Sequence, residues 1–312
     1  MRILITGGLG FIGSHLADAL KAKGHEVIVY DLKAGENILD VEKLKQKAKG
    51  VDGIIHFAAM QRVILGFRKP FDAIEHNVMG LSNVLNAALE NNAWVLFGSS
   101  KTVYGQPKKL PVKEGDEKNP TNIYSLTKYV SEMILNDFCR NYGLRAAVVR
   151  FSTIFGSERD LLDRAIPTFM YKAISNIDLV VEDPERTLDP VFIDDLIPAL
   201  MGMAELLSKS GKGFFDDFNA VSSQPVRIID AVNLILKITN SKAKIIGTKP
   251  PRSYDFGNYA GDNSKIQKLG FKAMPLESAL KIYHQRMQAA LQTGKYSKEE
   301  IDDMLKYYDK TN

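Results

Sequence analysis

The sequence predicts an α/β fold, in which a doubly wound parallel sheet of the Rossmann kind is joined to a smaller, mostly helical lobe. Two observations lead to this prediction. Through the first 151 residues, short apolar runs alternate with amphipathic helical patterns, which is typical of a parallel sheet covered by helices on both faces. A glycine-rich segment, residues 7–13, also joins the first apolar run to the first helical pattern, a connection found where doubly wound sheets begin.

Each expected strand is a run of mostly apolar residues, and each expected helix repeats apolar side chains every three or four residues. RILIT opens the chain as a buried strand, and Gly24 ends the helix that follows it. The expected strands are residues 2–6, 26–31, 52–58, 93–100 and 145–151, and the long helices are residues 11–23, 71–91 and 121–142. Right-handed crossovers between such strands give a doubly wound sheet.

The second half of the chain is less regular. Turn-rich stretches separate its helical patterns, which we place at residues 161–175, 194–208, 226–239, 276–291 and 297–309. We therefore predict a first domain over residues 1–155, to which parts of 188–222 return, and a lobe that takes up most of 156–312. Because no flexible linker separates them, the two parts are expected to share an interface.

Composition narrows the classes of partner. The chain has 312 residues, 45% of them hydrophobic, which is enough for a large core. Its 41 basic and 37 acidic residues are interspersed and leave a net charge of +4, which argues against nucleic-acid and membrane-surface partners. No apolar run approaches about 18 residues, and a strand begins at residue 2, so we expect neither a membrane span nor a signal peptide.

Side chains that form disulfides or bind metals are sparse. The single cysteine, Cys139, excludes a disulfide within the chain and fits a reducing cytoplasm, where we expect the protein to reside. Because it lies in a helical run, we interpret it as a buried thiol rather than a nucleophile. The five histidines are scattered and no group of residues has metal-ligand spacing, so no metal is expected.

The glycine-rich segment has the spacing of a phosphate-binding turn. Gly7 permits a tight turn, Gly10 lets the backbone approach a pyrophosphate, and Gly13 lets the helix pack close to the strand. The helix then presents free N–H groups and the positive end of its dipole to the phosphates. The alternative is a glycine-rich turn that binds nothing. Its position between a strand and a helix favours a dinucleotide-binding domain.

A carboxylate ends the second strand, 18 residues after Gly13. Asp31 is placed to accept hydrogen bonds from the adenosine ribose and to repel a 2′-phosphate, which favours NAD over NADP, although Lys33 lies close by. The alternative for Asp31 is a turn residue. Asp40, beside Val41, is predicted either to bond the adenine amine or to cap a helix, and the sequence does not distinguish the two roles.

Tyr124 and Lys128 share one face of the expected helix 121–142, because they are four residues apart. A neighbouring ammonium and a positive nicotinamide ring are expected to lower the pKa of Tyr124 and make it a base at neutral pH. Ser100 ends the strand 93–100, and strand carboxyl ends face the ligand crevice of such a sheet, so Ser100 is placed to bond the same substrate hydroxyl. The alternative for Tyr124 is a surface aromatic in a dimer interface.

Together these residues resemble the extended short-chain dehydrogenase/reductase family, and within it the NAD-dependent nucleotide-sugar epimerase/dehydratase branch, with its UDP-glucose 4-epimerases. The resembling motifs run through nearly the whole chain. They are TGGLGFIGSHL, HFAA (56–59), NVMGLSNVLNAA (from Asn77), SSKTVYG (99–105), YSLTK (124–128), RFSTIFG (150–156), VFIDDL (191–196), PPR (250–252) and LGF (269–271). This ordered series implies the fold and nicotinamide binding more specifically than it implies the reaction.

Carried over by position, the resemblance implies a catalytic trio, a cofactor site and substrate contacts. The trio is Ser100, Tyr124 and Lys128. Beyond the glycines, the NAD site would be lined by Phe11, Ile12, Asp31, Asp40, Val41, Phe57, Ala58, Ala59, Asn77, Ser152 and the Tyr124 and Lys128 of the trio. Gln61, Arg62 and Val63 lie where relatives begin to contact the sugar, and helix 161–175 would lie near the nucleotide base.

Two departures concern the reaction. Dehydratases of this branch carry an acidic pair after the Ser100 position, which protonates the leaving hydroxyl, and here these positions are Lys101 and Thr102. Without that acid, loss of water is hard to arrange, so a 4,6-dehydratase is disfavoured. Related decarboxylases keep a glutamate at the second position, so Thr102 counts against that reaction too.

Other departures concern the ligand. Thr153 replaces an asparagine that contacts the sugar phosphate, and Leu188 replaces an arginine that clamps the diphosphate. Arg186 is a candidate substitute for that arginine, and Arg252 matches the second clamp arginine. The stretch between Asp31 and His56 is also short, so one strand region is trimmed. Because of these changes, the sequence does not identify the nucleotide or the sugar.

Three functions remain after this comparison. The first is an NAD-dependent nucleotide-sugar epimerase that inverts carbon 4 through a transient 4-keto sugar, with Tyr124 as acid and base. The second is an NAD-dependent oxidoreductase that acts on a nucleotide-linked sugar and consumes its cofactor. The third, a dinucleotide-sensing protein without catalysis, leaves the intact trio unexplained.

A homodimer is also implied, because in relatives the helices that correspond to 71–91 and 121–142 pair as a four-helix bundle. Both helices here carry apolar stripes, formed by Val78, Leu81, Val84, Leu85, Tyr129, Met133 and Phe138. Such stripes also occur on helices that pack only within their own chain. The alternative is therefore that these side chains belong to the hydrophobic core of one chain.

Overall fold

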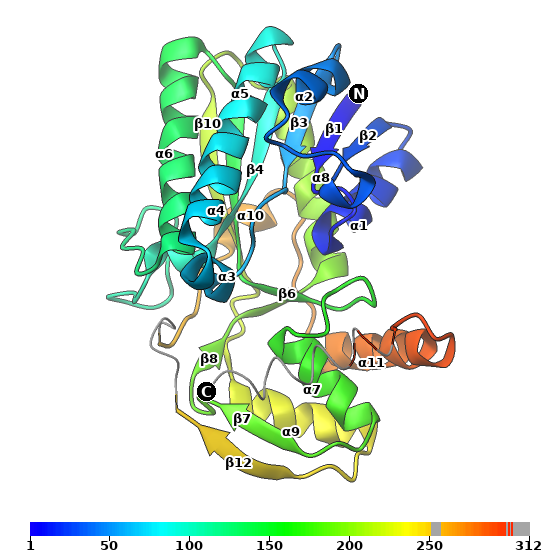
Figure 1. The fold of residues 1–312 in the computed structure, drawn as a ribbon. Helices are drawn as coiled ribbons and strands as arrows, with labels where there is room; N and C mark the ends of the chain where they lie inside the picture. Colours follow the sequence, from blue (N-terminus) through cyan, green and yellow to red (C-terminus); the bar gives the residue numbers. More distant parts are fainter. Residues whose placement is uncertain (251–256, 298, 300, 302–312) are drawn as a thin grey trace.

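A computed structural model describes residues 1–250, 257–297, 299 and 301 (Figure 1). Its centre is a six-stranded sheet with the order β10-β5-β4-β3-β1-β2, in which all neighbouring strands are parallel. The strands are β1 (Arg2–Thr6), β2 (Glu26–Tyr30), β3 (Gly53–His56), β4 (Trp94–Ser100), β5 (Ala146–Phe151) and β10 (Phe215–Ala220). The predicted doubly wound sheet is confirmed.

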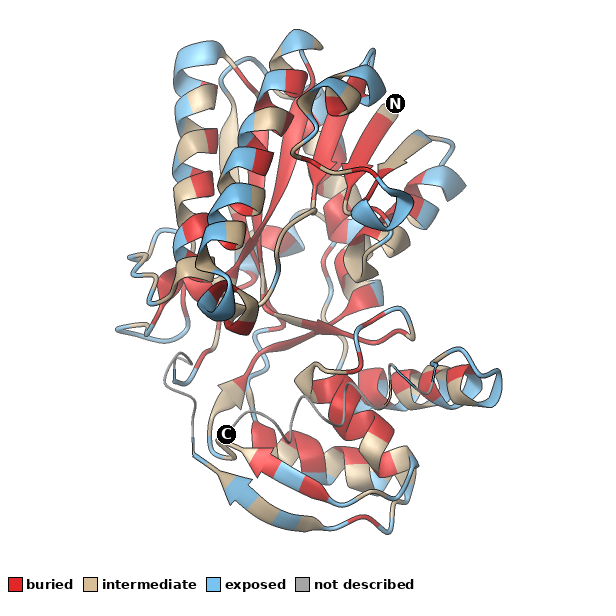
Figure 2. Ribbon diagram, viewed as in Figure 1, coloured by how far each residue is buried: buried red, intermediate tan, exposed pale blue. Residues whose placement is uncertain are grey.

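Helices cover both faces of this sheet, and the strands are buried between them (Figures 1 and 2). One face is covered by α2 (Val41–Ala48), α5 (Gly80–Glu90) and α6 (Ile123–Tyr142), and the other by α1 (Phe11–Ala22) and α8 (Ile193–Lys209). Ile3 and Ile5 join the core on the α1 and α8 side, while Leu4 joins the core on the opposite side. This alternation explains why each strand is apolar throughout.

The predicted helix 71–91 is interrupted. After α3 (Val63–Arg68), the chain forms α4 (Pro70–Ile74), a π-helical turn η2 (Glu75–Met79) and then α5. A π-turn holds one residue more than the α-helix that it interrupts, so it changes the direction in which the following side chains point. The turn contains Asn77, a predicted site residue.

One edge of the sheet agrees with the expectation and the other differs from it. No strand of the described residues pairs outside β2, because the short stretch that follows holds only the 3-10 helix η1 (Leu32–Ala34) and α2. This agrees with the predicted trimming. At the other edge, β10 pairs with β5, and the periodicity did not predict this strand because its sequence, FDDFNA, contains two acidic residues. Lys265 pairs with both carboxylates, Asp216 and Asp217.

The remaining elements form a separate cluster below the carboxyl edge of the sheet, which we call the helical lobe (Figure 1). Its helices are α7 (Ala165–Ile174), α9 (Ile228–Thr239) and α11 (Leu276–Gln292), which share a core that includes Met170, Val232 and Tyr283. Paired short strands border it: β7 (Leu179–Glu182) with β12 (Ile245–Lys249), β8 (Thr187–Leu188) with β11 (Val226–Arg227), and β6 (Thr153–Phe155) with β9 (Pro190–Phe192).

Two expected helices and one unexpected helix in the second half need comment. Helix α7 begins at Ala165, four residues later than expected, and the residues before it form a separate segment, 157–164. A short helix, α10 (Ser264–Gln267), packs near β10. The expected helix 297–309 falls almost entirely outside the described residues. Of the helices in the described ranges, none is long and apolar enough to cross a membrane.

Candidate active site

The glycine-rich turn lies at the carboxyl edge of the sheet, between β1 and α1 (Figure 1). Gly7 has a φ of +74°, and a Cβ atom on it would lie 2.6 Å from the amide nitrogen of Ala58. A Cβ atom on Gly13 would overlap the carbonyl oxygen of Gly7, so neither position has room for a side chain. The N–H of Gly7 donates to the carbonyl of Tyr30 (2.9 Å), and that of Gly10 donates to the carbonyl of Gly7 (3.0 Å).

Helix α1 begins without a side-chain cap, because its N-cap residue is Gly10. Phe11 and Ile12 open the helix and pack partly against the core beside α8. The N–H groups of the first turn therefore have no side-chain acceptor at the cap, and the positive end of the helix dipole points at the turn. An uncapped helix start behind a turn that excludes side chains fits a pyrophosphate, as the sequence predicted.

Both predicted adenosine carboxylates have local backbone partners. Asp31 is buried at the end of β2, and its carboxylate accepts hydrogen bonds from the N–H groups of Leu9 and Lys33, both at 2.9 Å. It therefore ties the glycine-rich turn to β2, and each oxygen retains a free lone pair. Asp40 is exposed and caps α2, accepting from the N–H of Lys43 at 3.1 Å. The cap alternative for Asp40 is thus confirmed, and its adenine contact stays a prediction, as does that of Val41, the first residue of α2.

The HFAA segment follows β3 along the same edge, where Phe57, Ala58 and Ala59 are half-buried. Asn77, which is buried, holds the end of this segment. Its side-chain oxygen accepts from the N–H of Met60 (2.8 Å), and its amide donates to the Met60 carbonyl (3.3 Å) and the Thr127 hydroxyl (3.0 Å). Asn77 therefore joins the segment after β3 to α6.

Ser100 is the last residue of β4, and its side chain lies at the start of the 3-10 helix η3 (Lys101–Tyr104). Its hydroxyl oxygen accepts from the N–H of Thr102 (3.3 Å) and from the Thr102 hydroxyl (3.0 Å). The serine is thereby oriented at the carboxyl edge, as predicted. The Thr102 hydroxyl is used in this contact, and Thr102 is buried.

Lys128 is buried on α6 and reaches the sheet. Its ammonium donates to the carbonyl of Gly98 at 2.7 Å and lies 4.8 Å from the centre of the Phe97 ring. Burial lowers the pKa of Lys128 from 10.5 to about 8, and the Glu132 carboxylate opposes this shift. The ammonium has three N–H groups, so further donors remain beside the bond to Gly98.

Tyr124 lies in the first turn of α6, which Asn122 caps by accepting from the N–H of Ser125 (3.0 Å). Burial raises the pKa of Tyr124, while a hydrogen bond with Ser100 and the charge of Arg164 act to lower it. The expected lowering of this pKa, by the Lys128 ammonium together with a positive nicotinamide ring, is therefore wrong in direction for the protein alone, because burial outweighs the groups that favour the phenolate.

The residues after HFAA face the segment 157–164. Gln61 is exposed, whereas Arg62 is half-buried and has a φ of +93°. The Arg62 guanidinium forms a two-point ion pair with the carboxylate of Asp163, which comes 101 residues later in the chain. Val63 starts α3. Arg62 therefore connects the segment after β3 to the helical lobe.

The other predicted ligand residues are spread along the boundary between sheet and lobe. Ser152 is buried and its hydroxyl donates to the carbonyl of Asp189 at 2.7 Å, while Thr153 is half-buried in β6. Arg186 lies 3.6 Å from the Asp183 carboxylate. Leu188 is buried in the core of the lobe. Arg252 lies outside the described residues.

Two ion pairs with buried carboxylates were not predicted. The first joins Arg164 to Asp160 (3.2 Å), four residues apart in the segment before α7. The second joins Arg150 to Glu132 (2.7 Å), four residues after Lys128 on α6. An i, i+4 charge search would have found the first pair, but periodicity alone does not show that its carboxylate is buried.

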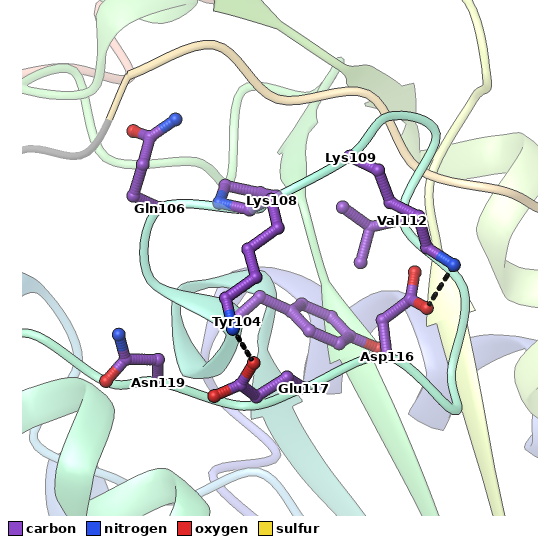
Figure 3. Close-up of a pocket in the computed structure, with 9 residues that line it drawn as sticks. Tyr104, Gln106, Lys108, Lys109, Val112, Asp116, Glu117 and Asn119 are labelled. Carbon is purple, nitrogen blue, oxygen red and sulfur yellow. Dashed lines mark hydrogen bonds and ion pairs between the residues drawn. The ribbon is translucent and has the colours of Figure 1, made fainter.

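A cavity of about 420 Å³ lies under the loop that follows η3 (Figure 3). Tyr104, Val112 and Asn119 help to line it, and two ion pairs stand at its sides: Lys108 with Glu117 (2.6 Å) and Lys109 with Asp116 (3.1 Å). None of the predicted site residues lines this cavity. The chemistry-bearing side chains lie along the sheet edge instead. In the described part of the chain, no group of three His, Cys, Asp or Glu residues could hold a metal ion.

Comparisons with known proteins agree with this geometry. The model of the NAD dependent epimerase/dehydratase family matches residues 3–219. A UDP-glucose 4-epimerase from Lactobacillus helveticus is 28% identical over 307 residues, which cover 87% of this chain and 92% of that protein.

Solved structures agree as well. The UDP-glucose 4-epimerase of Thermotoga maritima, solved with UDP-glucose, has a TM-score of 0.86 and 26% identity, covering 93% of this chain and all of that one. The UDP-glucose 4-epimerase of Brucella ovis, solved with NAD, has a TM-score of 0.80 and 27% identity, covering 89% of this chain and 96% of that one.

Proposed function

The chain belongs to the NAD dependent epimerase/dehydratase family, and we propose that it is an NAD-dependent epimerase that inverts carbon 4 of a UDP-linked sugar. One observation carries this proposal. The end of β4 and the first turns of α6 bring Ser100, Tyr124 and Lys128 to the carboxyl edge of the sheet, beside the glycine-rich turn. Similar proteins from Lactobacillus helveticus and Thermotoga maritima are UDP-glucose 4-epimerases.

The cofactor of this reaction is NAD. The N–H groups at the start of α1 would hold its pyrophosphate, and the free lone pairs of Asp31 would accept from its adenosine ribose. Lys128 has N–H groups left for the hydroxyls of the nicotinamide ribose. Bound there, NAD would supply the hydride acceptor and donor that the inversion of carbon 4 requires.

The chain's own residues handle the proton. Tyr124 removes the proton of the 4-hydroxyl group and later returns one to the same oxygen, so the phenol acts as base and then as acid. Ser100, held in place by Thr102, bonds the same sugar oxygen.

Loss of water is not proposed, because the positions after Ser100 carry no acid. Lys101 has no proton-donating carboxyl group, and the Thr102 hydroxyl already donates to Ser100. A dehydratase needs an acid at the leaving hydroxyl. The same pair argues against a decarboxylase.

We further propose a division of labour between residues 1–155, which bind the dinucleotide, and the lobe over most of 156–312, which binds the nucleotide sugar. The return of β10 to the sheet and the packing of α8 beside α1 support the assignment of parts of 188–222 to the first domain. Gln61, Arg62, Thr153, Arg186 and Arg252 are the proposed substrate contacts. Arg186 and Arg252 would face the diphosphate, since guanidinium groups bind phosphates at two points.

The activity is tested by incubating the protein with UDP-glucose, UDP-galactose and their N-acetyl forms. We expect interconversion at carbon 4 without net change in NADH absorbance. Steady formation or consumption of NADH would instead identify the alternative, a net oxidoreductase. Absence of any reaction with UDP, GDP, CDP and dTDP sugars would refute the epimerase proposal.

We also propose a homodimer, formed through the outer faces of α4, η2 and α6. The stripe residues Leu81, Val84 and Leu85 belong to the core of this chain, so they cannot form the interface. Other apolar side chains lie outside: Phe71 is 82% exposed and Met133 is 56% exposed. Both α4 and η2 contact α6, so the elements that carry these exposed side chains are neighbours.

The dimer is tested by analytical ultracentrifugation at micromolar concentration. We expect a dimer for the parent and a monomer for Phe71→Glu, because a charge at the centre of an apolar interface costs several kcal/mol. A monomeric parent would refute the proposal. The cytoplasmic location remains a prediction from the reduced state of Cys139.

A further inference from the structure

Helix α6 contacts the sheet through different kinds of side chain along its length. In its second half the contact is apolar, since Leu135 and Cys139 belong to the core between the helix and the sheet. One turn after Lys128, the side chain that meets the sheet is instead the buried carboxylate of Glu132, which contacts both β4 and β5. A charged contact therefore lies in the half of α6 that carries the trio.

Glu132 meets a row of polar side chains on the sheet. Phe97 belongs to the core on the α6 side, so Ser99, two residues later on β4, points to the same side. Arg150 is the direct partner of Ser99 on β5. The Ser99 hydroxyl donates to the Glu132 carboxylate (2.5 Å), and the Arg150 guanidinium donates to both carboxylate oxygens, at 3.0 Å and 2.7 Å. The carboxylate is thus bonded to two adjacent strands at once.

Arg150 is itself held from a third strand and from η3. Its guanidinium pairs with Asp217 on β10 (2.7 Å) and donates to the hydroxyl of Tyr104 (2.8 Å), the last residue of η3. The Tyr104 hydroxyl donates in turn to Asn219 (2.8 Å), which is the direct β10 partner of Arg150. The side chains of Arg150 and Glu132 are only 3% and 5% exposed. Because each group is bonded to the next and shielded from water, the guanidinium holds the carboxylate in one place.

These bonds lie next to two members of the trio. Lys128 precedes Glu132 by one helical turn, and its ammonium donates to the carbonyl of Gly98 (2.7 Å). Ser99 follows Gly98, and Ser100 follows Ser99. Two successive turns of α6 are therefore bonded to two successive residues of β4. This arrangement fixes the helix along the strand and sets the place of Lys128 relative to Ser100.

Stability alone does not account for a buried ion pair at this contact. Apolar side chains of similar volume are often as stabilising as a buried pair, because both charges lose their hydration. Apolar cores, however, lose a unique arrangement before they lose stability. Hydrogen bonds to a carboxylate are short and directional, so they define one relative position of helix and strand.

We propose that Glu132 is a positioning residue of the active site. Its carboxylate, held by Arg150, bonds the residue before Ser100 and so keeps Ser100 at a fixed place relative to Lys128. The proposal rests on the proposed function, in which Ser100 bonds the sugar oxygen and Lys128 bonds the nicotinamide ribose. A displacement of about 1 Å costs up to about 10²-fold in rate, so loss of the bond to β4 should slow the reaction.

The first test is the activity of Ser99→Ala, which removes the bond between α6 and β4 but leaves the Glu132–Arg150 pair in place. With UDP-glucose we expect kcat to fall about 10-fold while KM changes by less than about two-fold, because groups that act in the transition state are displaced. Ser222→Ala is the matched control. Ser222 is also buried and donates to a buried carboxylate, that of Asp189 (2.6 Å), but it lies on neither α6 nor β4. Its kcat should stay within about two-fold of the parent.

Glu132→Gln is the direct variant. It keeps an acceptor for Ser99 but loses the charge that holds Arg150, so kcat should fall at least as far as in Ser99→Ala. If Glu132→Gln does not fold, Ser99→Ala still decides, because it removes one hydrogen bond and no charge.

The second test separates positioning from a structural role and needs no turnover. Calorimetry measures the dissociation constant of NAD for the parent, Ser99→Ala, Lys128→Met and the double variant. We expect Ser99→Ala to weaken binding about 5-fold when Lys128 is present and to have no effect in the Lys128→Met background, because the two changes act on one contact. A structural role would weaken binding by the same factor in both backgrounds.

Equal weakening in both backgrounds, or a kcat of Ser99→Ala within about two-fold of the parent, would overturn the proposal. The proposed function fails separately. A parent that interconverts no nucleotide sugar, but whose NAD binding shows the expected dependence on Lys128, would refute the epimerase activity alone. An active epimerase in which the two changes are additive would refute the role of Glu132 alone.

Discussion

The glycine-rich turn and the edge that carries Tyr124 lie side by side but are built from different groups. The turn is made of backbone atoms, and Gly7 and Gly13 have no room for even a methyl group. The edge carries ionisable and hydroxyl side chains, and the Lys128 ammonium reaches the Gly98 carbonyl there from α6. Ligand binding at the glycine-rich turn therefore depends on steric fit, whereas the chemistry at the edge that carries Tyr124 depends on charge.

This difference predicts which changes each region tolerates. Steric fit does not depend on pH, so binding of the dinucleotide should vary little where no group of the turn titrates. The edge holds the buried Lys128 and the half-buried Tyr124, whose pKa values are both displaced by desolvation. Its chemistry should therefore depend on pH and on the charges placed around it.

The largest expected effect is that of a substitution at Tyr124, which should abolish turnover without affecting the glycine-rich turn. Tyr124→Phe removes the proton acceptor and leaves the turn intact, so epimerisation should fall about 10³-fold, while bound NAD stays close to the parent amount. Turnover of UDP-glucose and the NAD released on denaturation are the two measurements. Tyr142→Phe, an exposed tyrosine at the far end of the same helix, is the control and should keep full activity. Equal losses in both variants would contradict the role of Tyr124.

Much of the fold could be predicted because its signals are local. The alternation of Ile3, Leu4 and Ile5 places a strand between two cores, and the glycine spacing identifies the turn after it. β10 was missed because Asp216 and Asp217 break the apolar pattern, and their partner Lys265 comes from a distant helix. The π-turn was missed because its register shift has no sequence periodicity of its own.

In the candidate site, too, the residues with a local sequence signal could be predicted and those placed by tertiary packing could not. Tyr124 and Lys128 were placed on one helix face from their spacing, and Ser100 from the end of its strand. The pair of Asp160 with Arg164 was missed, because burial of the Asp160 carboxylate depends on how the segment 157–164 packs in the folded chain. The sequence spacing suggested that Lys128 acts on Tyr124, yet its ammonium is directed to the Gly98 carbonyl by tertiary packing.

The next effect tests the region built on shape. Gly13→Ala places a methyl group against the carbonyl of Gly7, and backbone cannot move aside as a side chain can, so we expect a loss of about 3 kcal/mol in the free energy of unfolding and loss of bound NAD. Urea unfolding and NAD release measure both. Gly115→Ala, where nothing lies within 4 Å, is the control and should change stability by less than about 0.5 kcal/mol. Similar behaviour of the two variants would show that the turn is not sterically tight.

The smallest expected effect is a pH dependence of the free energy of unfolding that arises from Lys128. It should appear at the edge that carries Tyr124 and not at the glycine-rich turn. The folded pKa of Lys128, about 8, lies below its usual 10.5, so between these values the unfolded chain binds the proton more tightly. The cost of the buried charge is therefore fully present below pH 8 and is relieved as the pH rises toward 10.5. Relative to Lys128→Met, which has no such charge, the parent should gain about 2 kcal/mol in the free energy of unfolding between pH 7.5 and 10. Urea unfolding of both proteins at these two pH values measures the gain, and parallel behaviour would mean that Lys128 is not charged at a cost in the folded protein.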